Sequence, residues 1–197
     1  MSKFQLPVLL PATEAATLTQ PFGVTANTLE PVGQHGEPHF HYGVDLVFGD
    51  PIHTYGIPLV CPFDDAKLTA FMSPPTSGIS TPFIQLEGYG ASGAHYKMIF
   101  GHVSQINFRS EYQAGDIIGL VGNYGLVWPQ PTPSNPFAGA HLHLGVQANG
   151  MWIDPLSIVD IGSPFIGTAY NEGVYVSRIA WALSQLEAQL AALISKQ

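Results

Sequence analysis

The stretch Gly139-Ala140-His141-Leu142-His143-Leu144 alternates apolar and polar side chains from Ala140 onward, a pattern typical of a β-strand. Residues two apart on a strand share one face and lie about 7 Å apart. His141 and His143 therefore point the same way, and one imidazole can bind a metal ion while the other reaches a substrate. The stretch predicts a polar site on one face of a β-sheet.

Two upstream segments carry similar chemistry. In His41-Tyr42-Gly43-Val44-Asp45, a histidine and a carboxylate stand four residues apart, and the glycine between them lets the backbone turn. A fully extended strand would separate the two by about 13 Å, too far for one zinc ion with bonds of about 2 Å. We therefore expect His41 to lie on a bend leading into the strand that carries Asp45. The third segment is Ile99-Phe100-Gly101-His102, a histidine that closes an apolar run.

Composition favours a single β-rich domain. The chain has 197 residues, of which 46% are hydrophobic and only 10% are charged, so a buried core is expected. Glycine and proline are abundant, with 21 and 17 residues, and favour short strands joined by turns. Seven apolar runs fit such strands: Gly43–Phe48, Pro58–Pro62, Lys67–Phe71, Pro82–Leu86, Tyr96–Phe100, Asp116–Val121 and His141–Gln147. They predict an antiparallel β-sandwich or open barrel, with the Pro-rich stretch from Val127 to Pro136 as a surface loop.

Charge and cysteine content exclude several classes of function. The formal net charge is −8 and no basic stripe occurs, so we expect no nucleic-acid partner. The lone Cys61 excludes an intrachain disulfide and a thiolate zinc cluster, so a metal ion must be held by histidine and carboxylate. The sequence contains no run of 18 apolar residues, so we expect no membrane-spanning helix. We interpret the first residues, MSKFQLPVLLPA, as mature sequence and not as a signal peptide.

The last part of the chain changes character. Apolar residues recur there at spacings of four, three, four and three: Ile179, Leu183, Leu186, Leu190 and Leu193. This periodicity predicts an amphipathic α-helix over residues 174–195, about 33 Å long at about 1.5 Å per residue. The helix cannot bury its apolar seam alone. It either packs back on its own β domain or pairs with another chain, by self-association or by docking to a virion or tail protein.

These segments together resemble the lysostaphin/LytM-type zinc endopeptidases of bacterial cell walls, whose hallmark is HxxxD followed far downstream by HxH. The resemblance covers about residues 18 to 157. Further segments resemble the family's sequence around these motifs: Pro21-Phe22-Gly23, Gly56-Ile57-Pro58-Leu59-Val60, Gly101-His102-Val103 and Ala114-Gly115-Asp116-Ile117-Ile118-Gly119-Leu120-Val121-Gly122. The resemblance implies a mainly β fold of the LytM (duplicated hybrid motif) type. We divide the chain into an N-terminal extension (1–17), the LytM-like domain (18–160), and a linker with the C-terminal helix (161–197).

The resemblance also assigns roles to residues. It implies that His41, Asp45 and His143 ligate one Zn²⁺ with an open fourth position, as in catalytic zinc sites. It implies that His102 and His141 hold and deprotonate the attacking water and stabilise the tetrahedral intermediate.

Other residues receive weaker or different expectations. His39 forms a second HxH with His41, but only His41 has the correct offset to Asp45. Tyr42 and Tyr124 are candidate substrate-binding residues. His35, His53 and His95 lie in turn-like segments and are expected to be exposed. Asp65 stands where the family has a turn glycine, and aspartate adopts left-handed backbone more readily than most residues.

The function that follows is hydrolysis of peptide bonds in the stem or cross-bridge of bacterial peptidoglycan. An enzyme of this kind acts in the cell wall or outside the cell. A phage virion enzyme or a phage lysis enzyme would reach the cell wall without an export signal. The alternative is a structural or assembly protein of a virion or envelope complex that keeps the fold without turnover. A cupin-type oxygenase is disfavoured, because His39-Phe40-His41 lacks the glutamate that should follow.

Overall fold

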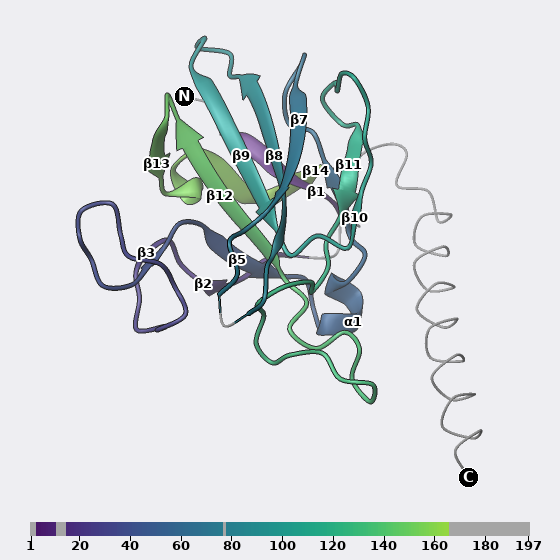
Figure 1. The fold of residues 1–197 in the computed structure, drawn as a ribbon. Helices are drawn as coiled ribbons and strands as arrows, with labels where there is room; N and C mark the ends of the chain where they lie inside the picture. Colours follow the sequence, from purple (N-terminus) through teal and green to yellow (C-terminus); the bar gives the residue numbers. More distant parts are fainter. Residues whose placement is uncertain (1–2, 11–14, 77, 166–197) are drawn as a thin grey trace.

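The computed structural model describes residues 3–10, 15–76 and 78–165 (Figure 1). Its elements are β1 (Phe4–Leu9), β2 (Thr17–Gln20), β3 (Gly23–Val24), β4 (Phe40–His41), β5 (Val44–Val47), α1 (Pro51–Thr54), β6 (Pro58–Val60), β7 (Lys67–Met72), β8 (Pro82–Tyr89), β9 (His95–Gly101), β10 (Gln105–Ile106), β11 (Ile117–Leu120), β12 (Leu142–Ala148), β13 (Met151–Ile153), the 3₁₀ helix η1 (Pro155–Ser157) and β14 (Val159–Phe165). In this part of the chain, no helix is long and apolar enough to cross a membrane. The C-terminal helix expected at 174–195 lies outside the described residues.

The strands form two main sheets. The larger has the order β2-β5-β12-β9-β8-β7, with β13 also paired to β12, and the smaller has the order β10-β11-β6-β1-β14. A short ribbon joins β3 to β4. Figure 1 shows β12 and β9 at the centre of the larger sheet. The mainly β, antiparallel class predicted from the sequence is confirmed, and all seven expected runs contain strands. One pair departs from it, because β1 runs parallel to β14.

Strand β1 and most of strand β14 lie outside the LytM-like domain expected over residues 18–160. β1 lies between β6 and β14 in the smaller sheet, and Leu6 and Val8 are fully buried. Pro7 interrupts the apolar run in β1 and Pro164 lies in β14. Prolines usually argue against a strand inside a sheet, which is why the sequence pattern did not indicate these two. The observed sheet therefore extends beyond the boundaries drawn at residues 18 and 160.

The core lies between the two sheets. On β12 the side chains of Leu142, Leu144 and Val146 are fully buried, and they belong to one apolar cluster with Leu6 and Val8 of the smaller sheet. Because side chains alternate along a strand, His143 lies on the opposite face of β12, away from this core. The same alternation that stabilises the sandwich thus sets the polar side chain on the outer face of the larger sheet.

Candidate metal centre

One cross-strand row on the outer face of the larger sheet carries the candidate centre. His143 of β12 pairs with Asp45 of β5 on one side and with Gly101 of β9 on the other. The row continues through Phe83 of β8 to Phe71 of β7, whose rings stack at 5.2 Å. Neighbouring strands lie about 4.8 Å apart, so the register itself brings a carboxylate and an imidazole into contact.

His41 joins Asp45 and His143 from a separate short strand. Its Nε2 lies 3.2 Å from Asp45 Oδ1 and 3.0 Å from His143 Nδ1. His143 Nδ1 lies 3.0 Å from the same Asp45 oxygen. The bend expected between His41 and Asp45 is therefore present, since these residues occupy different strands, β4 and β5, and their side chains meet.

The three donor atoms form a triangle that suits a tetrahedral metal ion. Bonds of about 2.0–2.1 Å at tetrahedral angles separate ligand atoms by about 3.3–3.4 Å, close to the observed 3.0–3.2 Å. His41 is 1% exposed and the other two side chains are about 15% exposed. The centre is thus shielded on the His41 side and accessible from the other. Among the described residues, these three are a group able to hold a metal ion.

The hydrogen bond of His41 fixes which ring nitrogen faces the centre. Its Nδ1 donates to the Pro21 carbonyl at 3.0 Å, because a carbonyl can only accept. In the neutral ring, Nε2 then carries a lone pair that points at a carboxylate oxygen and a second imidazole nitrogen. Such an arrangement is favourable only when a cation or a shared proton lies between the acceptors. The residues present therefore fit a divalent metal ion such as zinc.

The pKa values of Asp45 and His41 reflect the same crowding. Burial raises the pKa of Asp45, but hydrogen bonds from His143 and His41 outweigh it and hold the pKa of Asp45 well below its usual range. Burial lowers the pKa of His41, and its contacts with Asp45 more than compensate, so that the net shift is upward. Asp45 is therefore ionised at neutral pH and is available as a negatively charged ligand.

His102 and His141 form a second pair beside the triangle. Their ring centroids are 4.4 Å apart. His102 Nδ1 donates to the Tyr124 carbonyl at 2.9 Å, and His141 Nδ1 donates to the Gly139 carbonyl at 2.8 Å. Both rings therefore keep Nε2 free as an acceptor when neutral, and His141 Nε2 lies 3.7 Å from Asp45 Oδ2. Burial, with the neighbouring imidazoles His141 and His143, lowers the pKa of His102 to about 3, so it is neutral at physiological pH.

The backbone of His102 is unusual. Its φ is +60°, in the left-handed region that non-glycine residues rarely adopt. Strained conformations of this kind persist where the surroundings impose them and gather at functional sites. The hydrogen bond between His102 and Tyr124 is one such constraint. Asp65, the predicted substitute for a turn glycine, also adopts the left-handed region, with a φ of +54°.

Two glycines make room for the His143 ring. A Cβ on Gly43 would lie 2.7 Å from His143 Cε1, and a Cβ on Gly101 would lie 3.0 Å from His143 Cβ and 2.8 Å from Phe83. All three distances are shorter than ordinary contacts between carbon atoms. The glycine within the HxGxD segment is therefore needed for the close approach of β12, beyond any freedom to turn.

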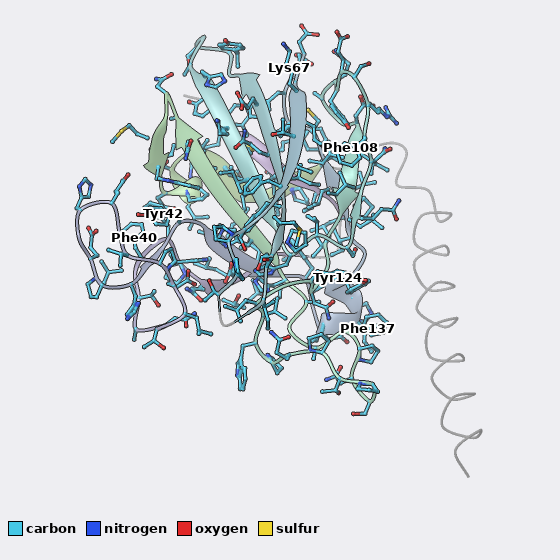
Figure 2. The ribbon with its side chains drawn as sticks, in the orientation of Figure 1. Phe40, Tyr42, Lys67, Phe108, Tyr124 and Phe137 are labelled. Atoms are coloured by element: carbon cyan, nitrogen blue, oxygen red, sulfur yellow. The ribbon has the colours of Figure 1, made fainter. Side chains whose placement is uncertain are left out.

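The other candidate residues lie around the centre. His39 Nδ1 donates to the Glu30 carbonyl at 3.1 Å and is outside the triangle. Tyr42 packs between Phe40 and Trp152, and its hydroxyl donates to the Val32 carbonyl at 3.4 Å. Tyr124 is 53% exposed, and its backbone forms two hydrogen bonds with His102: its carbonyl accepts from His102 Nδ1, and its N–H donates to the His102 carbonyl at 3.4 Å. Figure 2 shows Tyr42 on the left of the view and Tyr124 at the lower right of the sheet.

The remaining expected exposures are mostly confirmed. His35 and His53 are exposed. His95 is the exception, because it lies in β9 and is half-buried, with its Nε2 3.3 Å from a Glu87 carboxylate oxygen. The glycines around His95 indicate a turn, whereas strand pairing with β8 extends one residue beyond Tyr96, to His95.

Sequence reasoning missed Trp152 and Phe83. A Cβ on Gly145 would lie 2.9 Å from the Trp152 ring, so Trp152 occupies the space beside Gly145 on the outer face. Phe83 packs edge-on to the His143 ring, with centroids 6.1 Å apart. Neither has a motif, and only the register of β8, β9 and β13 brings them to the centre.

The Pro-rich loop is anchored next to the His102 and His141 pair. Asn123 Nδ2 donates to the carbonyls of Pro136 and Ala138, each at 2.9 Å. Phe137 is buried against Tyr55 and Ala140. Trp128, by contrast, is 84% exposed. The stretch from Val127 to Pro136 contains no strand, as expected, but its C-terminal end is packed and not free.

No family model and no curated protein sequence matches this chain. Its structure is similar to that of a zinc-containing peptidase from Vibrio cholerae, with a TM-score of 0.50 and 21% sequence identity. The match covers 79% of this chain and 40% of that one. The fold is of the LytM type.

Two further structures with lower scores are similar to this LytM-type fold. One is the catalytic domain of the prophage-encoded M23 protein EnpA from Enterococcus faecalis, with a TM-score of 0.45, 20% identity, and coverage of 74% of this chain and 92% of that one. The other is lysostaphin, with a TM-score of 0.46, 22% identity, and coverage of 80% and 58%. The similarity to the Vibrio cholerae peptidase confirms, at the level of fold, the resemblance drawn from the sequence.

Proposed function

We propose that this chain is a zinc-dependent endopeptidase that hydrolyses peptide bonds in the stem or cross-bridge of bacterial peptidoglycan. The observation that carries the proposal is the donor triangle of His41, Asp45 and His143 beside the pair His102 and His141. Two imidazoles and one carboxylate with an accessible side are the donor set of catalytic zinc sites. A purely structural site would be expected to use a fourth protein ligand.

Zinc bound to the triangle would supply Lewis acidity, which lowers the pKa of water towards about 7 and polarises a carbonyl. Two of the chain's own residues are placed to accept a proton from water. His102 and His141 each present a free Nε2 acceptor, because their Nδ1 atoms are held by backbone carbonyls. Such acceptors orient water and take its proton. After the transfer, the same imidazolium can donate to the developing charge or to the leaving amine.

The site of action that we propose is the cell wall, reached from outside the cell or from a phage virion. We further propose that the C-terminal helix expected at 174–195 serves self-association or docking to a virion or tail protein. The acidic net charge of −8 agrees with a peptide substrate and not with a polyanion.

Purified peptidoglycan sacculi from several hosts test the proposal. We expect the zinc-loaded chain to release muropeptides and create new amino termini, read by mass spectrometry, which also names the bond. A chelator and the His143→Ala variant should abolish both, while His39→Ala should not, since His39 lies outside the triangle.

Other outcomes would contradict the proposal in separable ways. Zinc binding without cleavage of any wall would favour the assembly protein that keeps this fold without turnover. Cleavage that persists in His143→Ala or with chelator would overturn the assignment of the centre itself.

A further inference from the structure

An aromatic surface extends from the candidate centre across the outer face of the larger sheet. Gly101 of β9 pairs with His143 on one side and with Phe83 of β8 on the other. Phe83 in turn pairs with Phe71 of β7. Directly paired residues of antiparallel strands place their side chains on the same face of a sheet. Phe83 and Phe71, named here the aromatic row, therefore lie on the face that carries the donor triangle.

Gly101 leaves no side chain between His143 and the aromatic row. A Cβ on Gly101 would lie 2.8 Å from Phe83 Cε1, so the Phe83 ring occupies the space over the glycine. The ring meets His143 edge-on, with centroids 6.1 Å apart. It also stacks on the Phe71 ring, with centroids 5.2 Å apart and an interplanar angle of 13°. The apolar surface is therefore continuous from the donor triangle to Phe71.

The outer end of this surface is open and has no polar group of its own. Phe71 is 43% exposed, and between it and His143 the row contains only Gly101 and Phe83. A sugar hydroxyl or a charged group placed there would lose water without gaining a hydrogen bond from these side chains. An aliphatic side chain loses nothing of that kind and gains from burial. The aromatic row therefore fits an aliphatic group.

The polar neighbours of the aromatic row are already engaged. Gln85 and Thr69 pair with each other one step further along β8 and β7, on the same outer face. The Gln85 amide donates to Glu87 Oε1 at 2.7 Å and to Thr69 Oγ1 at 3.4 Å. These contacts hold the amide at the edge of the row and leave the rings as the exposed surface.

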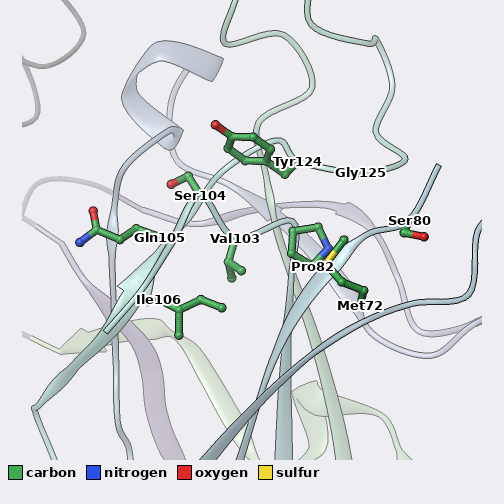
Figure 3. Close-up of a pocket in the computed structure, with 9 residues that line it drawn as sticks. All are labelled: Met72, Ser80, Pro82, Val103, Ser104, Gln105, Ile106, Tyr124 and Gly125. Carbon is green, nitrogen blue, oxygen red and sulfur yellow. The ribbon is translucent and has the colours of Figure 1, made fainter. Parts of the chain in front are cut away.

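The opposite side of the same strands has different surroundings. Met72 pairs with Pro82 next to the aromatic row, and side chains alternate along a strand, so both point away from the row. Figure 3 shows these two side chains close together in a separate pocket, which Val103 also lines. Met72 thus shares its strand and its exposed position with Phe71 but not its face, and it is the matched control.

We propose that the aromatic row holds an aliphatic side chain of the peptide substrate near the scissile bond. The inference rests on the proposed function and deepens it by naming a preferred class of substrate. An extended peptide advances about 3.3 Å per residue, so a residue within about three or four positions of a carbonyl held at the centre reaches the row. A glycine bridge has no side chain to place there. Partial burial of a leucine side chain on such a surface is worth about 5- to 20-fold in kcat/KM.

Blocked hexaglycine and versions in which leucine replaces one glycine at a time are the probes. For the zinc-loaded full chain, we expect leucine at one position to raise kcat/KM about 5- to 20-fold over hexaglycine. Phe71→Ala should reduce this leucine-to-glycine ratio at least about threefold, because it removes the exposed ring. Met72→Ala, at a position that is 59% exposed on the opposite side, should keep the ratio of the unaltered chain.

A second readout detects binding and keeps the aromatic ring, so it does not depend on the folding of Phe71→Ala. 4-Fluorophenylalanine replaces Phe71, or Phe108 as the control, in the zinc-loaded His141→Ala chain, where turnover is expected to be slow. Phe108 is 67% exposed and follows β10, outside the aromatic row. The leucine peptide should shift the ¹⁹F resonance at position 71 more than hexaglycine does, and it should leave the resonance at position 108 in place.

The two readouts separate this inference from the proposed function. Hydrolysis without a leucine preference, or a preference that survives in folded Phe71→Ala, would overturn the role of the aromatic row while the endopeptidase stands. A leucine-dependent shift at position 71 without any hydrolysis would support the row as a peptide-binding surface and overturn the enzyme. Absence of both hydrolysis and shift would overturn both proposals.

Discussion

The chain contains two HxH segments with opposite fates. His141-Leu142-His143 leads into β12, a seven-residue strand with β5 and β9 on either side, so His143 has Asp45 and Gly101 as direct neighbours. His39-Phe40-His41 ends in β4, a two-residue strand paired only with β3 among the described strands, and His39 turns to the Glu30 carbonyl. One segment therefore gives two residues to the site and the other gives one. The pattern becomes a metal site only where neighbouring strands supply the remaining donor.

The largest expected effect comes from breaking the triangle at its centre. His143→Ala removes a donor that lies 3.0 Å from both of the others. Zinc affinity should fall by more than about 100-fold, since even the loss of a residue that only supports a ligand costs about 10- to 100-fold. Elemental analysis after gel filtration measures this, and an unchanged zinc content would show that the ion is held elsewhere.

His141→Ala distinguishes the role of His141 from that of His143 within the segment His141-Leu142-His143. The variant should keep one zinc per chain, because the triangle is untouched, and should lose about 10²- to 10⁴-fold in kcat, the usual contribution of a general acid or base. Steady-state kinetics with parallel zinc analysis give both numbers. Loss of zinc together with activity would make His141 a ligand and not a proton-transfer group.

Gly43→Ala tests the close approach that the register requires. The added Cβ would stand 2.7 Å from the His143 ring, so β5 or the imidazole must move. We expect a loss of about 10-fold or more in zinc affinity and roughly 1–3 kcal/mol in the free energy of unfolding, measured by competition with a chelating dye and by urea denaturation.

Gly162→Ala is the control for that change. Gly162 lies in β14, and its added Cβ would come no closer than 3.4 Å to Asp160 Oδ1, an ordinary contact. Equal effects of the two substitutions on zinc affinity would refute a specific steric role for Gly43.

The smallest expected effect is at His39, which lies outside the donor triangle. His39→Ala loses one hydrogen bond to a carbonyl at a half-buried position, which should cost about 1 kcal/mol in the free energy of unfolding. Zinc content and kcat should match those of the unaltered chain. A marked loss of zinc in this variant would erase the distinction between the two segments.

The sequence allowed much of this site to be predicted, because its chemistry depends on residue types at short spacings. The two His-containing segments, the seven strands and the left-handed Asp65 are all local features. The apolar alternation of β12 already indicates which face carries His143.

The remainder depends on contacts between distant segments. Strands β1 and β14 could not be predicted, because Pro7 and Pro164 lie within them. Their pairing joins the two ends of the described part of the chain. Phe83, Phe71 and Trp152 reach the outer face through strand register, which no spacing within one segment encodes. The choice of His41 over His39 could be made from the offset to Asp45, but the bond of His39 to Glu30 that accompanies it could not.

The most direct test of the central claim is a crystal structure of the zinc-loaded chain with anomalous diffraction data at the zinc absorption edge. We predict a single peak in this domain, within about 2.0–2.2 Å of His41 Nε2, Asp45 Oδ1 and His143 Nδ1, with His102 and His141 unbound beside it. A peak that includes His39 or His102 among its ligands, or no peak at the triangle, would contradict it.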